Sequence, residues 1–129
     1  METILNNEVS VLGTYNEIPT TITSDVLAVT MIDGLTVVKT ADKTVWADGT
    51  LTYTITIDNQ TTGTFTSPVV TDVLDITKKN FVADSVYIDD VKAEQSAYTY
   101  NEDGTLTITL TDIAASSQKK ITFQVTKKQ

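Results

Sequence analysis

Three segments of the chain alternate between apolar and polar residues, and this period of two constrains the fold more than any other feature. Apolar residues occupy every second position in the runs 51–57, 106–110 and 121–125, and threonine fills nearly all the positions between them. Successive side chains of a strand point to opposite faces, so each run predicts a β-strand with one buried face. The composition agrees, because 26 Thr, 14 Val and 11 Ile stand against 8 Leu, and Cβ-branched residues favour strands.

Less regular apolar segments predict further strands at 35–40, 67–74 and 85–91. Asp48-Gly49 and Asp103-Gly104 predict tight turns, because both residue types tolerate positive φ. No segment has a convincing helical period. The sequence therefore predicts an all-β fold, an immunoglobulin-like two-sheet sandwich with an N-terminal β-strand extension.

The extension covers residues 1–33, and the β-sandwich domain covers residues 34–129. Residues 8–15 alternate like a strand, and residues 20–32 read as a second one that is apolar on both faces near its end. Disordered tails are poorer in Val and Ile and richer in charge than this segment. An extension with this composition is expected to dock on a partner surface.

Residue types that are absent exclude several function classes. The chain has no Cys, His or Arg, which leaves no disulfide, no thiolate or imidazole metal ligand, and no imidazole base. The net charge of −8 predicts repulsion from nucleic acid. No apolar run reaches the roughly 18 residues that span a bilayer. We expect no enzyme, no cofactor, no metal site, no nucleic-acid partner and no membrane span.

Four motifs follow one another along the domain. They are a Lys-Thr-Ala-Asp strand, a Gly-then-Tyr strand, a Val-Thr-Asp-x-Leu segment and a closing Ile-Thr-Phe-x-Val strand, at Val38–Asp42, Gly49–Asn59, Val70–Leu74 and Ile121–Val125. With these motifs in this order, the domain resembles a family of repeats from bacterial and archaeal surface proteins, known as domain of unknown function eleven. The resemblance covers about three-quarters of the chain.

The resemblance implies that the domain lacks its last strand. Tandem members add a strand containing Asn-x-Ala-x-Val after the closing motif, and here a similar segment, residues 5–11, precedes the domain instead. It implies a stand-alone fibre subunit on a cell or spore surface, assembled head-to-tail with copies of itself by donor-strand complementation. The side chains expected in the interface are Ile4, Val9, Val11, Tyr15, Ile22, Val26 and Val29.

Related fimbrial domains also join a lysine to an asparagine of the last strand, with an acid nearby. By this resemblance Lys39 is the candidate nucleophile, Asp72 the acid, and Asn6 or Asn7 the acceptor of an isopeptide bond between subunits. The chemistry needs a neutral amine and a protonated carboxyl, which burial favours. The alternative is an exposed Asp72 and a Lys39 that reaches into water, as is usual for charged residues.

Other functions remain open at this point. The chain is alternatively an adhesin or binding module, or a spacer domain of a stalk protein. Trp46 is expected to pack on the sandwich rim in preference to stacking on a sugar, and Tyr98 and Tyr100 are expected to be packing partners. A solvated face is the expected role of a group of acids that lacks calcium-loop spacing, namely Asp84, Asp89, Asp90 and Glu94.

Overall fold

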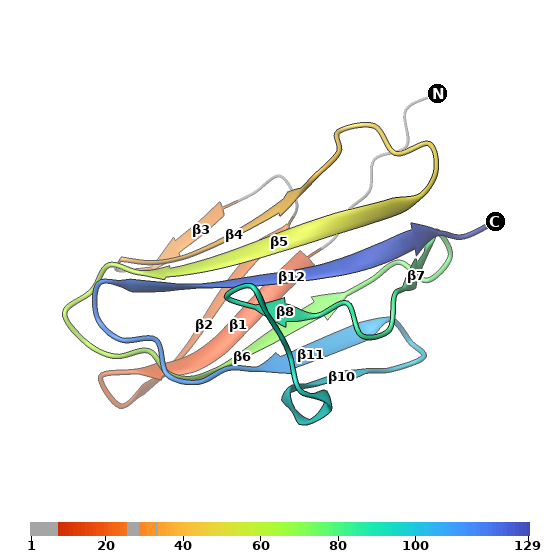
Figure 1. Cartoon of the computed structure of the whole chain (residues 1–129). Helices are drawn as coiled ribbons and strands as arrows, with labels where there is room; N and C mark the ends of the chain where they lie inside the picture. Colours follow the sequence, from red (N-terminus) through yellow and green to blue (C-terminus); the bar gives the residue numbers. More distant parts are fainter. Residues whose placement is uncertain (1–7, 26–28, 33) are drawn as a thin grey trace.

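The computed structural model describes residues 8–25, 29–32 and 34–129, which form two antiparallel β-sheets packed face to face (Figure 1). The five-stranded sheet has the order β10 (Tyr98–Tyr100), β11 (Thr105–Thr109), β6 (Thr66–Val73), β1 (Glu8–Tyr15) and β2 (Ile18–Asp25). The seven-stranded sheet has the order β3 (Val29–Ile32), β4 (Leu35–Ala41), β5 (Thr50–Asn59), β12 (Ser117–Lys127), β8 (Tyr87–Ile88) and β9 (Val91–Lys92), with β7 (Lys79–Phe81) also paired to β12. A short 3₁₀ helix, η1, covers Gln95–Ala97. The prediction of an all-β two-sheet sandwich is confirmed.

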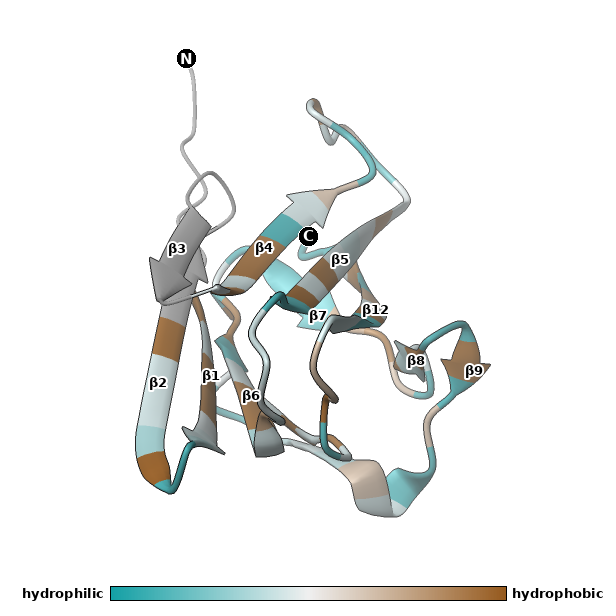
Figure 2. Cartoon of the chain, turned by 90° about the vertical axis from the view of Figure 1, so that its left-hand side faces the viewer, coloured by the Kyte–Doolittle hydropathy of each residue, from teal (hydrophilic) through white to brown (hydrophobic). Residues whose placement is uncertain are grey.

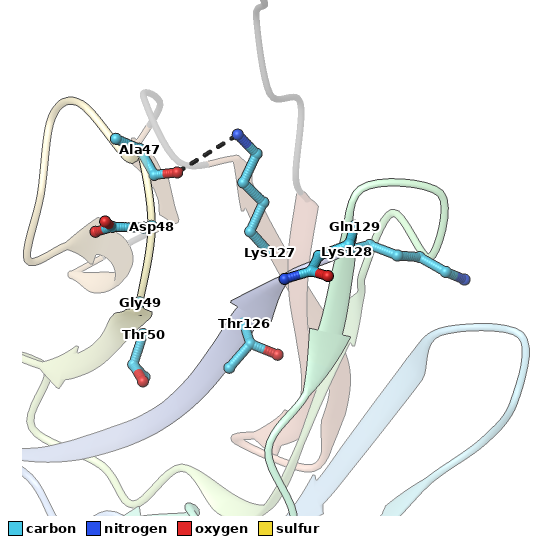
Figure 3. A pocket seen from close by; sticks show the side chains of 8 residues that line it. All are labelled: Ala47, Asp48, Gly49, Thr50, Thr126, Lys127, Lys128 and Gln129. Carbon is cyan, nitrogen blue, oxygen red and sulfur yellow. Dashed lines mark hydrogen bonds between the residues drawn. The ribbon is translucent and has the colours of Figure 1, made fainter.

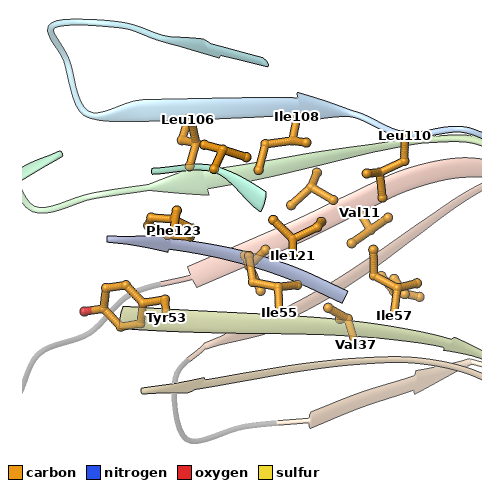
Figure 4. Close-up of a cluster of buried hydrophobic side chains, with 14 of the residues drawn as sticks. Val11, Val37, Tyr53, Ile55, Ile57, Leu106, Ile108, Leu110, Ile121 and Phe123 are labelled. Atoms are coloured by element: carbon orange, nitrogen blue, oxygen red, sulfur yellow. The ribbon is translucent and has the colours of Figure 1, made fainter. Parts of the chain in front are cut away.

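The core lies between the sheets and is built from the alternating positions of the strands (Figure 4). Every second residue of β5 is buried from Leu51 to Asn59, and β12 buries its residues from Ile121 to Val125 in the same way. Figure 2 displays this alternation as bands of opposite hydropathy along β4 and β5. The threonines between these positions face outward, so the period of two in the sequence fixes which face of each strand is buried.

Two strand predictions were wrong in their extent. The expected strand 20–32 is two strands in different sheets, because β2 pairs with β1 whereas β3 pairs with β4. The expected strand 85–91 is reduced to the two-residue strands β8 and β9. Between them Asp89 and Asp90 have φ values of 50° and 67°, which form a tight hairpin turn without glycine.

The N-terminal strand β1 lies inside its sheet, with β2 on one side and β6 on the other. Its residues Val9 and Val11 are fully buried in the core, and so is Ile22 of β2. β2 also lies against β4 of the opposite sheet. The β1–β2 hairpin thus completes the sandwich along one side in this single chain. No helix among the described residues is long and apolar enough to cross a membrane.

The contribution of β1 to the core can be measured with two neighbouring substitutions. Val11→Ala should lower the free energy of unfolding by about 2 kcal/mol, because it removes two buried methyl groups and leaves a cavity. Leu12→Ala should change it by less than about 0.5 kcal/mol, because Leu12 is half exposed on the outer face. Urea denaturation of dilute monomer measures both values. Equal stabilities of the two variants would contradict the docking of β1 on its own domain.

Candidate functional site

β1 fits into a groove beside β6 with matched backbone and side chains. Val9 pairs with Asp72 and Val11 pairs with Val70 in an antiparallel ladder. Further along, Gly13 lies against the ring of Phe65, and a Cβ at Gly13 would lie 1.9 Å from Cε1 of that ring. A residue with a Cβ would collide with the Phe65 ring, so only glycine fits at position 13. The groove therefore recognises β1 through its ladder, two buried valines and one glycine.

The predicted interface residues divide into three groups. Val9, Val11 and Ile22 are fully buried, and Tyr15 is partly buried against the core. Val29 belongs to β3, where it pairs with Val38, and its side chain is not described. Ile4 and Val26 lie outside the described residues.

The two sheets meet at a buried pair of opposite charges. Lys39 lies on β4 of the seven-stranded sheet, and Asp72 lies on β6 of the five-stranded sheet, next to Val9 of β1. Lys39 Nζ and Asp72 Oδ2 are 2.6 Å apart, and both side chains have no exposed surface. Apart from this ion pair, neither Nζ nor the two carboxylate oxygens has a hydrogen-bond partner among the described residues.

Aromatic rings and a second lysine surround this pair. Lys39 Nζ lies 4.2 Å from the ring centroid of Tyr53 and 5.7 Å from that of Phe123, which gives it two cation–π contacts. Lys79 of β7 is also buried, and its Nζ donates a hydrogen bond of 2.9 Å to the Tyr53 hydroxyl. The cluster thus holds two lysines and one carboxyl in an apolar interior.

Burial disfavours the charged form of all three groups. Desolvation lowers the pKa of Lys39 and raises the pKa of Asp72, and their mutual attraction opposes both shifts. Desolvation and the nearby Lys39 charge lower the pKa of Lys79 to about 8. These shifts bring an amine and a carboxylic acid toward the neutral forms that can react with one another.

The structure contradicts the exposed alternative for Lys39 and Asp72, since both are fully enclosed and paired. The register explains why: Lys39 shares the inward parity of Leu35 and Val37, and Asp72 shares that of Val70 and Leu74. Asn6 and Asn7, the predicted acceptors, lie outside the described residues, so their bond to Lys39 stays a prediction.

Sequence reasoning missed Lys79 and Tyr53 as members of this site. Lys79 follows another lysine in a polar stretch, which reads as an exposed segment. Only the pairing of β7 with β12 turns Lys79 inward, while its neighbour Lys78 stays exposed. The alternation of 51–57 marked Tyr53 as buried but did not indicate its polar contact.

The other residues singled out in the sequence have structural roles. Trp46 is partly buried against the core, and its indole N–H donates to the Gly49 carbonyl at 3.2 Å. Phe81 stacks on Tyr100 with ring centroids 4.6 Å apart and meets the edge of Tyr98. These contacts confirm the expected packing roles.

The acidic group forms an exposed face. Asp84, Asp89, Asp90 and Glu94 are all exposed, and Asp90 forms an ion pair with Lys120 at 2.7 Å. Within the described part of the chain no three acidic side chains gather closely enough to hold a metal ion.

An open hollow lies between the β4–β5 loop and the end of β12 (Figure 3). Lys127 Nζ reaches across it to the Ala47 carbonyl at 3.5 Å. None of the eight side chains that line it is aromatic, so it offers no stacking platform for a sugar ring.

Comparisons with known proteins give no relatives. No model of a protein family matches the chain, and no curated protein and no solved structure matches it either. The resemblance to the surface-repeat family therefore stays a prediction that rests on the four motifs.

The lowered pKa of Lys79 predicts a dependence of stability on pH. The folded value of about 8 lies below the ordinary value of 10.5, so the unfolded chain binds more protons between these pH values. The free energy of unfolding should therefore rise across this window, by on the order of 3 kcal/mol at about 1.4 kcal/mol per pKa unit. Below pH 8 the folded protein buries Lys79 in its charged form, so the free-energy cost of burying that charge is present in full.

Denaturation of the wild type and of Lys79→Met from pH 7 to pH 10.5 tests this. The variant should lose the part of the rise that Lys79 contributes, whereas Lys78→Met should keep the full rise because Lys78 is exposed. The same rise in Lys79→Met as in the wild type would show that Lys79 is not its source.

Proposed function

We propose that this protein is a structural subunit of an extracellular fibre on a cell or spore surface, in which the β1–β2 hairpin of one copy completes the sandwich of the next. The observation that carries the proposal is the position of β1 inside the five-stranded sheet, between β6 and β2. Without β1, residues Val69 to Asp72 of β6 have no partner on that side. An open edge over an exposed core is a template for pairing with another chain.

The free energy gained when the β1–β2 hairpin docks beside β6 is large, so the domain needs a hairpin in this groove. Val9, Val11 and Ile22 are fully buried, and at about 1.5–3 kcal/mol each they contribute roughly 5–9 kcal/mol before ordering costs. Ladder bonds to β6 add on the order of 1 kcal/mol each. A domain that leaves this groove empty would be poorly stable, so the hairpin has to dock somewhere.

Every contact of the hairpin is available in either of two copies, because the copies have identical sequences. In the single chain the hairpin docks on its own domain. The same ladder and the same pockets are satisfied when it docks on a neighbour, as in domain swapping. The donor hairpin and the acceptor groove are different surfaces, so exchange in one direction along successive copies gives an open filament, whereas reciprocal exchange between two copies gives a closed dimer.

The pairing of β3 defines which segment is free to exchange. Ile32 pairs with Leu35, so β3 is held to the domain by its antiparallel ladder with β4. The predicted boundary between the extension, residues 1–33, and the domain, residues 34–129, therefore falls between two strands that pair with each other. Because this ladder ties β3 to the domain, the exchanging segment is the β1–β2 hairpin, which spans Glu8–Asp25.

A spacer domain of a stalk protein is the second candidate, because the hairpin docks in cis in the single chain. This arrangement needs no neighbour and gives a closed sandwich. The binding-module alternative has no comparable observation in its favour, since the hollow beside β12 has no aromatic lining.

A pair of engineered cysteines distinguishes exchange from docking in cis. Ser10 of β1 pairs with Thr71 of β6, and both side chains face away from the core. Opposite residues in antiparallel strands have Cα atoms about 4.5–5.5 Å apart, within the range of a disulfide. The chain has no other cysteine. Ser10→Cys/Thr71→Cys, refolded at high concentration and oxidised, should give a ladder of covalent multimers on a non-reducing gel, and filaments by electron microscopy.

A mixture of the two single variants provides the control. When isotope-labelled Ser10→Cys is refolded with unlabelled Thr71→Cys, a disulfide between the two positions can form only between chains, so it reports exchange directly. If the double variant yields only oxidised monomer at every concentration, and the mixture yields no cross-chain disulfide, the fibre proposal fails and the spacer domain is favoured.

A further inference from the structure

The Lys39–Asp72 pair is in reactive contact. The amine nitrogen and one carboxyl oxygen are 2.6 Å apart, so with a C–O bond of about 1.2 Å the nitrogen lies within about 4 Å of the carboxyl carbon of Asp72. Both side chains are closed off from solvent, and neither has another hydrogen-bond partner among the described residues. Reacting groups held in contact in this way avoid the entropic cost of a bimolecular encounter.

The surroundings favour the neutral forms of both groups. The rings of Tyr53 and Phe123 lie over Lys39 Nζ, and they cannot replace the hydration that a buried ammonium and carboxylate lose. Transfer of one proton from the ammonium to the carboxylate converts the ion pair into an amine and a carboxylic acid. The pKa shifts of Lys39 and Asp72 have the directions that this transfer requires.

We propose that Lys39 and Asp72 form an amide bond with each other and thereby cross-link the two sheets. The Nζ lone pair attacks Cγ of the protonated carboxyl, and the new N–C bond forms. The hydroxyl group then leaves with a proton from the nitrogen as one molecule of water. The step needs no oxidant, reductant or cofactor. Exclusion of solvent from the core opposes the reverse hydrolysis.

A second lysine–aspartate pair in the same chain serves as an internal comparison. Lys120 Nζ and Asp90 Oδ1 are 2.7 Å apart, nearly the same distance, but both side chains are solvent-accessible. The desolvation that favours the neutral, reactive forms of an amine and a carboxyl requires burial, which the exposed pair lacks. The enclosed pair is therefore the reactive one, and distance alone does not distinguish the two.

The bond gives Asp72 a different role from the one that the sequence suggested. In the prediction from the sequence, Asp72 is the acid that assists a bond from Lys39 to Asn6 or Asn7, and that bond would release ammonia. In the bond proposed from the structure, Asp72 is itself the acceptor, and the product links β4 to β6 within one chain. This bond is independent of whether the β1–β2 hairpin exchanges between copies. It would hold the acceptor domain together in a chain that has no disulfide.

Intact-mass measurement of the full-length protein, followed by tryptic mapping, tests the bond. We expect a mass lower than the sequence mass by one water. Mapping is required because succinimide formation at Asp48-Gly49 or Asp103-Gly104 removes a water as well. Trypsin does not cleave after an acylated lysine, so the Lys39–Asp72 bond joins peptide 1–43 to peptide 44–78. A bond from Lys39 to Asn6 or Asn7 would instead stay inside peptide 1–43.

Two variants complete the test. Asp72→Ala should restore the full sequence mass and abolish the branched peptide, whereas Asp90→Ala, in the exposed pair, should leave both unchanged. Recovery of peptides 1–39 and 44–78 unlinked from the folded wild type would overturn the proposal. An ammonia loss located within peptide 1–43 would overturn it equally. The wild-type map decides the question even if Asp72→Ala does not fold.

Discussion

The ladder between β1 and β6 is the interaction on which the closure of this sandwich depends. β6 has β11 on one side, and on the other side its backbone groups are paired only through β1. The same strand supplies Val9 and Val11 to the core, so backbone pairing and side-chain burial are satisfied together or lost together. Because unpaired strand edges and exposed apolar faces both carry a large free-energy cost, the domain needs β1 from some chain.

Contact energy does not distinguish a hairpin from the same chain from a hairpin of a neighbouring copy, so concentration and kinetics would decide between them. A hairpin docked in cis and one docked in trans make the same ladder, fill the same pockets and place Gly13 against Phe65. Docking in cis loses less translational entropy, whereas exchange gains from high local concentration. The pairing of β3 with β4 restricts the proposed exchange to the β1–β2 hairpin.

The buried cluster adds a chemical feature to an otherwise apolar core. A lysine and an aspartate from opposite sheets meet where water is excluded, and a second lysine is held at the Tyr53 hydroxyl. Such groups are costly as charges, and replacement of buried ion pairs by apolar residues is often stabilising. Their presence is therefore poorly explained by stability alone. The proposed amide bond would remove two of the three charges and connect β4 to β6.

The sequence by itself determined the fold class and the alternating core positions, because the period of two in a strand is a local property of the chain. It left open whether Lys39 and Asp72 face the core or the solvent. It did not separate β2 from β3, since a change of sheet depends on which strands pair and not on hydropathy. It also did not indicate the short hairpin at Asp89-Asp90. Tertiary structure alone decided that Lys39 and Asp72 meet, that Lys79 turns inward, and that β1 lies between β2 and β6. Those arrangements depend on strand pairing and sheet packing between residues far apart in the chain, and a single sequence carries no direct signal for them.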